Sequence, residues 1–362
     1  MMPMQTRAGL AHSDRRVFLQ ALGAGALGYT LSASGLFAAD VRGGKPIRGL
    51  FPIGASPFTD DNQLDLEVLA AEVKFLNRGG VHGVIWPQIA SEWTTLSKKE
   101  RLDGAEAMVA AGKGGKTAIV IGVQSPEMAD VLEYTRHADK IGADALCSIT
   151  PAGVTDDAAL FDYYKQIAGL SGLPLFMQSQ PFPVSIELIT RMYKEIPSFR
   201  QIKDEAGDTL ARIAQIRNAT NDEVKVFTGN GVRMMMNELL LGAQGYCPTV
   251  DLADIYAQAF DLWQAGKRTE AFDMFGRVLT FGSITQAVNA PQKYVLMARG
   301  VFKNTRTRGG GSMAAGVAPP PPGGAGARGG GGGGRGPARP FTPESEKVVR
   351  EALAMLKPYM RG

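Results

Sequence analysis

The chain has 362 residues, of which 44% are hydrophobic, enough for a sizeable core in one large domain or two average ones. Its net charge is +4, but residues 1–39 contribute +2 and residues 303–340 contribute +6, so the remainder carries −4. That remainder shows no basic stripe interleaved with aromatic residues, which argues against a nucleic-acid partner.

Residues 1–39 have the layout of an export signal. Arg15 and Arg16 precede Phe18-Leu19, an apolar run over 21–31 and a stretch of small residues. The run is too short and too rich in glycine for a membrane-spanning helix. The arginine pair followed by Phe-Leu resembles a twin-arginine signal. We therefore expect a periplasmic or otherwise exported protein with no membrane anchor after processing; the alternative is a buried N-terminal helix with a chance arginine pair.

From residue 48 onward, short apolar runs alternate with amphipathic stretches. The predicted strands cover 48–53, 82–87, 116–123, 145–150, 174–178, 200–203, 224–228 and 245–248. The predicted helices cover 64–78, 98–111, 128–141, 157–168, 186–196, 209–217 and 233–241, and another begins at Asp251. Eight strand–helix units in about 220 residues predict an α/β fold, the (β/α)₈ TIM barrel. The competing fold, an open doubly wound sheet, is disfavoured because this region has no G-x-G-x-x-G motif.

The C-terminal third predicts extra helices and an interruption. Helical patterns continue past the eighth unit to residue 301, so the barrel and its first C-terminal helices occupy 46–303. Residues 304–341 include Pro319–Pro322 and a glycine run, a composition typical of disorder. A final helix is predicted over 342–360. The interrupting segment is thus a Gly/Pro/Arg-rich insertion, for which a flexible loop is favoured over contact with an anionic surface.

Cysteine and histidine are scarce. Cys147 and Cys247 lie in apolar stretches, so we expect small buried residues and no disulfide framework. The histidines His12, His82 and His137 do not stand in a metal-ligand spacing. We therefore predict a protein that uses no metal and no cofactor.

Lys203 is the strongest candidate for chemistry. The stretch 199–208 begins like a strand and ends like a helix start, so Lys203 stands where the strand stops. In a TIM barrel, catalytic groups project from this position. A lysine in such a pocket can lose its proton and attack a ketone, forming a Schiff base. The alternatives are a surface lysine or one that pairs with Asp204.

Short motifs elsewhere follow a common order. Residues 55–58 read Ala-Ser-Pro-Phe, 91–97 read Ser-Glu-Trp-Thr-Thr-Leu-Ser, 201–204 read Gln-Ile-Lys-Asp and 226–230 read Val-Phe-Thr-Gly-Asn. Together they resemble the dihydrodipicolinate synthase / N-acetylneuraminate lyase family of class I aldolases, over roughly residues 46–303 and 340–358. The resemblance implies a TIM barrel, a Schiff-base lysine at Lys203, a substrate-binding residue at Gly229 and a homo-oligomer, either a dimer or a tetramer.

The chain departs from this family in its binding loops. The family's carboxylate-binding sequence Gly-Thr-Thr-Gly-Glu is replaced by Gln88-Ile89-Ala90-Ser91-Glu92, which leaves the amides of Ala90 and Ser91 as the candidate anion site. Glu92 is expected to accept backbone amides and shape this substrate-binding loop. The family's Tyr-Asn-x-Pro after strand five becomes Gln178-Ser179-Gln180-Pro181, so the proton-relay tyrosine is missing. We expect Gln178 and Ser179 to contact the substrate or a water.

Lys203 and the family resemblance together imply a Schiff-base-forming lyase, an aldolase or dehydratase, that acts on a 2-keto acid or sugar-derived acid. Pro183 stands near the place of an arginine found in true dihydrodipicolinate synthases, which argues against the lysine-biosynthetic reaction. The proton relay stays open among Glu92, Asp204, Glu205 and the substrate's own carboxylate. The alternatives are a non-catalytic periplasmic barrel that binds a keto or sugar acid, and a structural role tied to the insertion.

Overall fold

The computed structural model describes residues 44–229, 233–309 and 340–361. The chain divides into two units, Met1–Val41 and Arg42–Gly362, and the described residues belong to the second. The predicted export signal over 1–39 and most of the predicted insertion lie outside the described residues. Within the described ranges, none of the helices combines the length and the apolar character that a membrane crossing requires.

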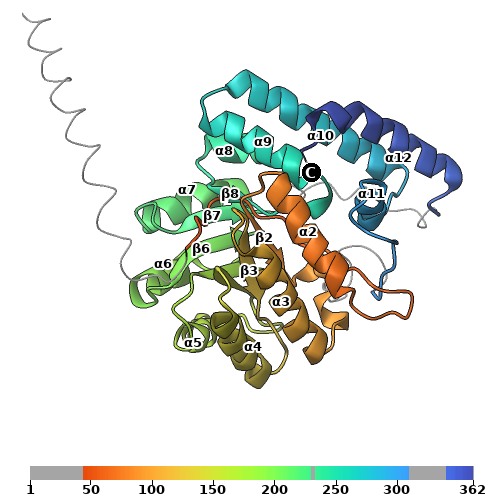
Figure 1. The fold of residues 1–362 in the computed structure, drawn as a ribbon. Coiled ribbons are helices and arrows are strands. Elements are labelled where there is room, and N and C mark those ends of the chain that lie inside the picture. The colour runs from red at the N-terminus through yellow and green to blue at the C-terminus, as the bar shows by residue number, and fades with distance from the viewer. Residues whose placement is uncertain (1–43, 230–232, 310–339, 362) are drawn as a thin grey trace, which may run out of the picture. The chain divides into compact units, whose positions relative to one another are not determined.

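Eight short parallel strands form the centre of the second unit (Figure 1). They are β1 Gly49–Leu50, β2 Gly83–Trp86, β3 Ala118–Gly122, β4 Ala145–Ile149, β5 Leu175–Ser179, β6 Phe199–Asp204, β7 Lys225–Thr228 and β8 Gly245–Tyr246. Each strand from β2 to β7 pairs with the next, and β8 pairs with β1. A bridge between Ile53 and Ile85 joins the chain after β1 to β2. The strands therefore close into a (β/α)₈ barrel, as predicted.

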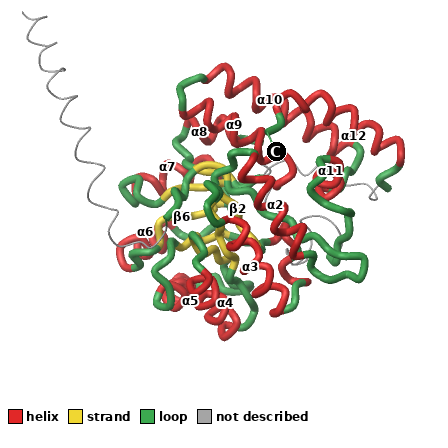
Figure 2. Tube along the Cα trace, in the orientation of Figure 1, coloured by secondary structure: helices red, strands yellow, loops and turns green. Residues whose placement is uncertain are grey.

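Helices surround the strands on the outside (Figure 2). They are α2 Leu66–Arg78, α3 Lys98–Gly112, α4 Met128–Ile141, α5 Asp157–Ala168, α6 Ile186–Glu195, α7 Thr209–Ala219, α8 Met235–Leu240 and α9 Ala253–Gln264. Several begin at a polar N-cap whose side chain accepts an amide hydrogen bond: Asp65, Ser97, Asp156, Ser185 and Asp208. These caps fix where each loop after a strand ends.

Additional helices lie beyond α9 on one side of the barrel (Figure 1). They are α10 Arg268–Ala287, α11 Gln292–Ala298 and α12 Pro343–Leu356, and α10 packs on both α9 and α12. The sequence showed helical patterns through Trp263 to Val288 and again from Gln292 to Val301. In the structure α9 ends before Gly266, whose φ of +77° suits glycine, and α10 begins at Arg268.

The inside of the barrel is filled with apolar side chains, in a core separate from the larger one between strands and helices. Its members include Phe51, Phe176 and Phe227, whose rings contact one another at centroid distances of 4.9–6.0 Å. Cys147 and Cys247 belong to the same core as free, buried thiols, which confirms the prediction for both. This filling leaves the carboxyl ends of the strands as the place for a polar site.

The chain remains in contact with the barrel past residue 304, the predicted start of the insertion. Asn304 Nδ2 donates to the carbonyl of Phe58 at 3.0 Å, and the Arg308 guanidinium binds both oxygens of Glu100. Contacts extend to Gly309, whose amide donates to Glu92. Composition did not predict this, because the stabilising partners of these residues lie more than 200 positions away in the sequence.

Candidate active site

Lys203 lies one residue before the end of β6, and its side chain points into the mouth of the barrel. The residue is buried, with 4% of its surface exposed. Its Nζ atom lies 3.1 Å from Oε2 of Glu205, which directly follows the strand. Strand alternation explains the pair, because residues two apart on a strand face the same side. The structure therefore gives Lys203 the strand-end position that the sequence predicts, with a carboxylate as its neighbour.

The electrostatics of Lys203 favour the ammonium form. Burial lowers the pKa of the amine, but the Glu205 carboxylate opposes burial, and the pKa lies above its ordinary value. Two thiols also lie close to this amine. Burial raises the pKa of Cys147 to about 12 and raises that of Cys247 as well. Both thiols are therefore neutral at pH 7, and Glu205 is the anion that matters for the charge of Lys203.

Glu205 is positioned by residues on β5 and by a residue that follows β7. Gln178 Nε2 on β5 donates to its Oε2 at 2.7 Å, and its own amide donates to Ser179 Oγ at 3.1 Å. Gly229, after β7, leaves room for the pair. A Cβ atom there would lie 2.0 Å from Glu205 Oε1 and 2.7 Å from Lys203 Cε. Of the predicted site residues, Gln178 and Gly229 thus lie beside the pair of Lys203 and Glu205, whereas Ser179 contacts the backbone of Glu205 and the side chain of Asp204.

Asp204 pairs with a different cation, although it shares the contact to Ser179 with Glu205. Its oxygens accept hydrogen bonds from Arg212 Nε at 2.7 Å and from Ser179 Oγ at 2.7 Å. The Asp204 side chain is 1% exposed and lies on the opposite face of β6 from Lys203. The ion-pair partner of Asp204 is therefore Arg212, whereas that of Lys203 is Glu205.

The predicted anion-binding loop folds as a 3₁₀ turn, Ile89–Ser91. The amide of Ser91 donates to the carbonyl of Gln88 at 2.9 Å, and Ser91 Oγ donates to the carbonyl of Gly54 at 2.5 Å. Ser91 thereby ties the loop to the chain after β1. Ala90 packs against the apolar core inside the barrel. Binding of an anion by Ala90 and Ser91 stays a prediction, and Ser91 has a structural task in addition.

Glu92 forms a second lysine–glutamate pair. Its Oε1 lies 2.6 Å from Lys293 Nζ on α11, and its Oε2 accepts the amides of Arg308 and Gly309 at 2.7 and 2.9 Å. Lys293 Nζ also donates to the carbonyl of Arg306 at 2.6 Å. The carboxylate of Glu92 is thus surrounded by donors, which suits a structural role better than proton transfer.

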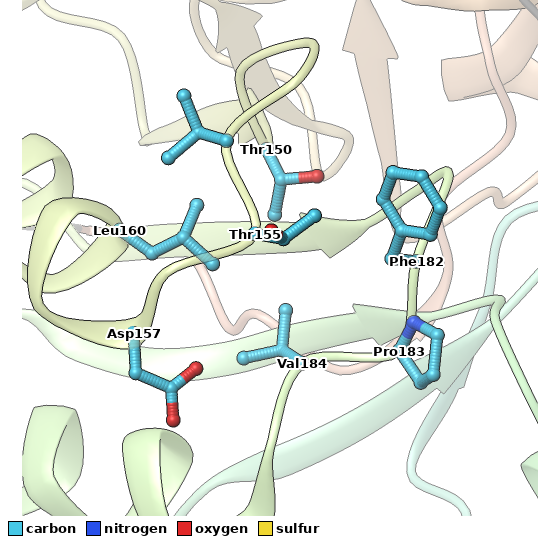
Figure 3. A pocket seen from close by; sticks show the side chains of 8 residues that line it. Thr150, Thr155, Asp157, Leu160, Phe182, Pro183 and Val184 are labelled. Atoms are coloured by element: carbon cyan, nitrogen blue, oxygen red, sulfur yellow. The ribbon is translucent and has the colours of Figure 1, made fainter.

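A cavity of about 240 Å³ lies between the loops that follow β4 and β5 (Figure 3). It is lined by Thr150, Val154, Thr155, Asp157, Leu160, Phe182, Pro183 and Val184. Phe182 and Pro183 form one side of the view, and Thr150 and Thr155 lie across from them. Lys203 and Glu205 are not among the lining residues. The cavity is therefore a separate space beside the pair of Lys203 and Glu205, at the same end of the barrel.

Across the described residues, no group of three or more histidine, cysteine, aspartate or glutamate side chains is arranged to hold a metal ion. The reactive groups assembled at the barrel mouth are an amine, a carboxyl group and amide side chains. This set suits nucleophilic addition and proton transfer.

Comparisons with known proteins agree on one family. The model of the dihydrodipicolinate synthetase family matches residues 46–309. Over 207 residues the chain is 30% identical to a 4-hydroxy-tetrahydrodipicolinate synthase of Methanothrix thermoacetophila, covering 56% of this chain and 69% of that protein. Over 259 residues it is 26% identical to an uncharacterized DapA-like lyase of Pyrococcus horikoshii, covering 68% and 88% of the two chains.

Solved structures share the fold. YagE, a prophage protein of the dihydrodipicolinic acid synthase family from E. coli K12 in complex with pyruvate, matches with a TM-score of 0.67 at 20% identity, over 86% of this chain and 99% of that one. Dihydrodipicolinate synthase from Rhodopseudomonas palustris matches with a TM-score of 0.69 at 21% identity, over 85% and 97%.

Proposed function

Because this chain belongs to the dihydrodipicolinate synthetase family, we propose that it is a Schiff-base-forming lyase, an aldolase or dehydratase, with Lys203 as the nucleophile. The observation that carries the proposal is the buried Lys203 amine at the end of β6, with a carboxylate 3.1 Å away. A buried lysine is costly unless it is paired. The pairing here keeps the amine beside a group that can accept its proton.

The chemistry follows from that arrangement. Transfer of one proton from Lys203 to Glu205 leaves a neutral amine and a neutral acid. The amine then adds to a ketone carbon, and loss of water gives a protonated imine on Lys203. This cation withdraws electrons from the neighbouring carbon. In an aldolase, the bond from that carbon to the next breaks as the hydroxyl group on the far carbon loses its proton and becomes a carbonyl. In a dehydratase, the neighbouring carbon first loses a proton, and the enamine then expels a protonated hydroxyl group from the next carbon as water. The same intermediate serves an aldolase and a dehydratase.

For the substrate we propose a 2-keto acid or a sugar-derived acid. The complex of YagE with pyruvate, a 2-keto acid, supports this class. The amide side chain of Gln178, which replaces the family's tyrosine, and Pro183 after β5 support a substrate other than that of the lysine-biosynthetic reaction. A barrel that only binds its ligand would not need a nucleophile next to a proton acceptor, so the non-catalytic alternative is less well supported.

Reductive trapping tests this proposal. The protein is incubated with pyruvate and with other 2-keto acids, reduced with borohydride, digested and examined by mass spectrometry. We expect a reduced adduct on the peptide that contains Lys203 and none in Lys203→Ala. Absence of an adduct with every keto acid, together with unchanged ligand binding by Lys203→Ala, would leave the binding-protein alternative instead.

We propose in addition that residues 1–39 direct export through the twin-arginine route. The Arg15-Arg16 pair before the apolar run supports this. A fusion of these residues to a reporter protein should be exported in a bacterium, and replacement of both arginines by lysine should retain it in the cytoplasm. Export of the doubly substituted fusion at the unchanged level would contradict the route.

We propose that the protein forms a homo-oligomer, a dimer or tetramer. Large apolar side chains exposed on the added helices support this: Phe272 on α10 is 65% exposed and Met355 on α12 is 67% exposed. Sedimentation velocity of the purified protein should give a mass of two or four chains. A single species at the mass of one chain would contradict the proposal.

A further inference from the structure

Glu205 lies where a proton must be given and taken during the reaction of Lys203. We infer that Glu205 is the catalytic acid and base of this site and relays protons in place of the family's tyrosine, which this chain lacks. This inference rests on the proposed Schiff-base function. Its carboxyl group is 7% exposed and directly contacts the Lys203 amine. It therefore reaches the nitrogen at which the imine forms.

The neighbouring carboxylates are committed to other partners. Asp204 is bound by the guanidinium group of Arg212 and by Ser179. Glu92 is bound by Lys293 and by two backbone amides. Protonation of either would break an ion pair that the fold uses. The ion-pair partner of Glu205, in contrast, is the lysine that must itself lose a proton.

Neighbouring strands hold the Glu205 carboxyl group in this position. In the β5–β6 register, Gln178 lies directly opposite Lys203, and its Nε2 donates to Glu205 Oε2. Because Gly229 has no Cβ atom, there is room beside it for Oε1, the other oxygen of Glu205. Within the described part of the chain, Gln178 Oε1 is buried and has no hydrogen-bond partner. It is therefore an acceptor for the hydroxyl group of a carbinolamine or of a substrate.

Each step balances with Glu205 as the only proton carrier. The Lys203 ammonium gives a proton to Glu205, and the amine adds to the ketone carbon as the carbonyl electron pair moves to oxygen. That oxygen takes the proton from Glu205, and the nitrogen, now positively charged, returns one to it, which leaves a neutral carbinolamine. Glu205 then protonates the hydroxyl group, water leaves, and the nitrogen lone pair forms the C=N bond. The products are a protonated imine and the Glu205 carboxylate, with the same total charge as at the start.

The regenerated carboxylate is placed for the next step. The carbon that becomes acidic in the imine is two bonds from the nitrogen, and Glu205 lies within hydrogen-bond distance of that nitrogen. Removal of its proton by Glu205 gives a neutral enamine and a neutral acid. The negative charge of the Glu205 carboxylate also repels a substrate carboxylate that lies next to it. We therefore expect the carboxylate of a keto acid to point away from Glu205.

Hydrogen exchange into pyruvate tests this role separately from imine formation. In D₂O, the wild-type protein should replace the methyl hydrogens of pyruvate with deuterium, which is followed as loss of the methyl proton NMR signal. Glu205→Gln keeps the volume of the side chain. The hydrogen bond from Gln178 to the carboxyl group is then replaced by a contact between two amides. We expect it to lower the exchange rate by about 100-fold or more, because general acid–base catalysis contributes on that order. Prolonged incubation with borohydride should still trap pyruvate on Lys203, because loss of the anion leaves burial to favour the neutral amine.

Two further variants give the matched comparison. Glu238→Gln makes the same change at a buried carboxyl group that is hydrogen-bonded to Thr228, and exchange should be unchanged. Glu205→Asp keeps a carboxyl group on a side chain one bond shorter, so it should retain part of the exchange rate. The exchange rate of Glu205→Asp should also depend on pH, whereas that of Glu205→Gln should lack this dependence. Exchange by Glu205→Gln within about three-fold of wild type would overturn the catalytic role while trapping on Lys203 still supports the lyase. Absence of a Lys203 adduct in wild type would overturn the proposed function and this inference with it.

Discussion

The molecule contains two buried lysine–glutamate pairs that match in residue type and differ in surroundings. Lys203 and Glu205 lie two positions apart at the end of β6, with nitrogen and oxygen 3.1 Å apart. Lys293 and Glu92 are 201 residues apart and come together at 2.6 Å. Glu92 also accepts two backbone amides, and Lys293 also donates to a carbonyl. The second pair therefore joins α11 and the segment after it to the loop after β2, whereas the first faces the inside of the barrel.

The pKa values of the two lysines shift in opposite directions, and the shift alone does not identify the nucleophile. Burial lowers the pKa of Lys293 despite its contact with Glu92. The pKa of Lys203 is raised, because Glu205 more than offsets burial. By this measure Lys293 would be the readier amine at neutral pH. The proposal that Lys203 is the nucleophile rests instead on its position, because Lys203 projects from a barrel strand at the end where catalytic groups gather.

The same substitution at both lysines should give the largest contrast. Lys203→Met should abolish the borohydride adduct and lower turnover or pyruvate exchange by at least about 10³-fold, as expected for loss of a nucleophile. Lys293→Met should keep the adduct. Mass spectrometry of the trapped proteins and the NMR exchange rate measure both effects. Loss of the adduct in folded Lys293→Met, with an adduct persisting in Lys203→Met, would exchange the two assignments.

The structural pair should show its effect in stability. Lys293→Met should lower the free energy of unfolding by about 3–5 kcal/mol, because it leaves a buried carboxylate without its cation. Adding Glu92→Gln should recover part of the loss, giving a coupling energy above about 1 kcal/mol in the double-mutant cycle. Urea denaturation at pH 7 measures all four proteins. Strictly additive losses would mean that the two side chains do not stabilise each other.

The sequence predicted the barrel because alternating strands and helices follow from local hydrophobic periodicity. It also predicted that Lys203 stands at the end of a strand, since such an end can be recognised from the residues around it, while the role of Lys203 as nucleophile stays a prediction. Glu205 was one of several open choices for the proton relay, and strand alternation counted from Lys203 was the signal that could have favoured it over Asp204. The partners of Glu92 carried no such signal. A contact between positions 92 and 293 depends on tertiary packing of α11, which local patterns do not encode.

The completely buried Glu72 on α2 gives a test through pH. Its Oε1 accepts the amide of Ala55 at 3.0 Å, and burial raises its pKa from 4.5 to about 8, with Lys293 opposing the rise. Its contribution to stability is therefore fully present below pH 4.5 and is lost as the pH rises towards 8, by at most about 1.4 kcal/mol per pH unit.

Glu72→Gln should remove this slope. Between pH 5.5 and 7.5 the wild-type protein should lose up to about 2.7 kcal/mol through Glu72, and the variant should lack this loss. The difference between the two proteins in urea denaturation at each pH isolates the residue from other titrating groups. A difference that does not change with pH would show that Glu72 is ionised in the folded protein throughout this range.

Arg308 should have the smallest effect, because its partners lie nearer to the surface. Its guanidinium binds both oxygens of Glu100, at 2.8 and 2.5 Å, and lowers the pKa of that carboxyl group to about 2. Arg308→Ala should reduce the free energy of unfolding by about 1–2 kcal/mol at pH 7. Arg308→Lys should keep the charge but lose the bidentate contact. Its free energy of unfolding should therefore lie between those of the wild type and Arg308→Ala. Neither variant should change trapping on Lys203, because Arg308 acts through Glu100 and the segment beside Glu92. Equal stability of all three proteins would show that this contact does not hold residues 304–309 against the barrel.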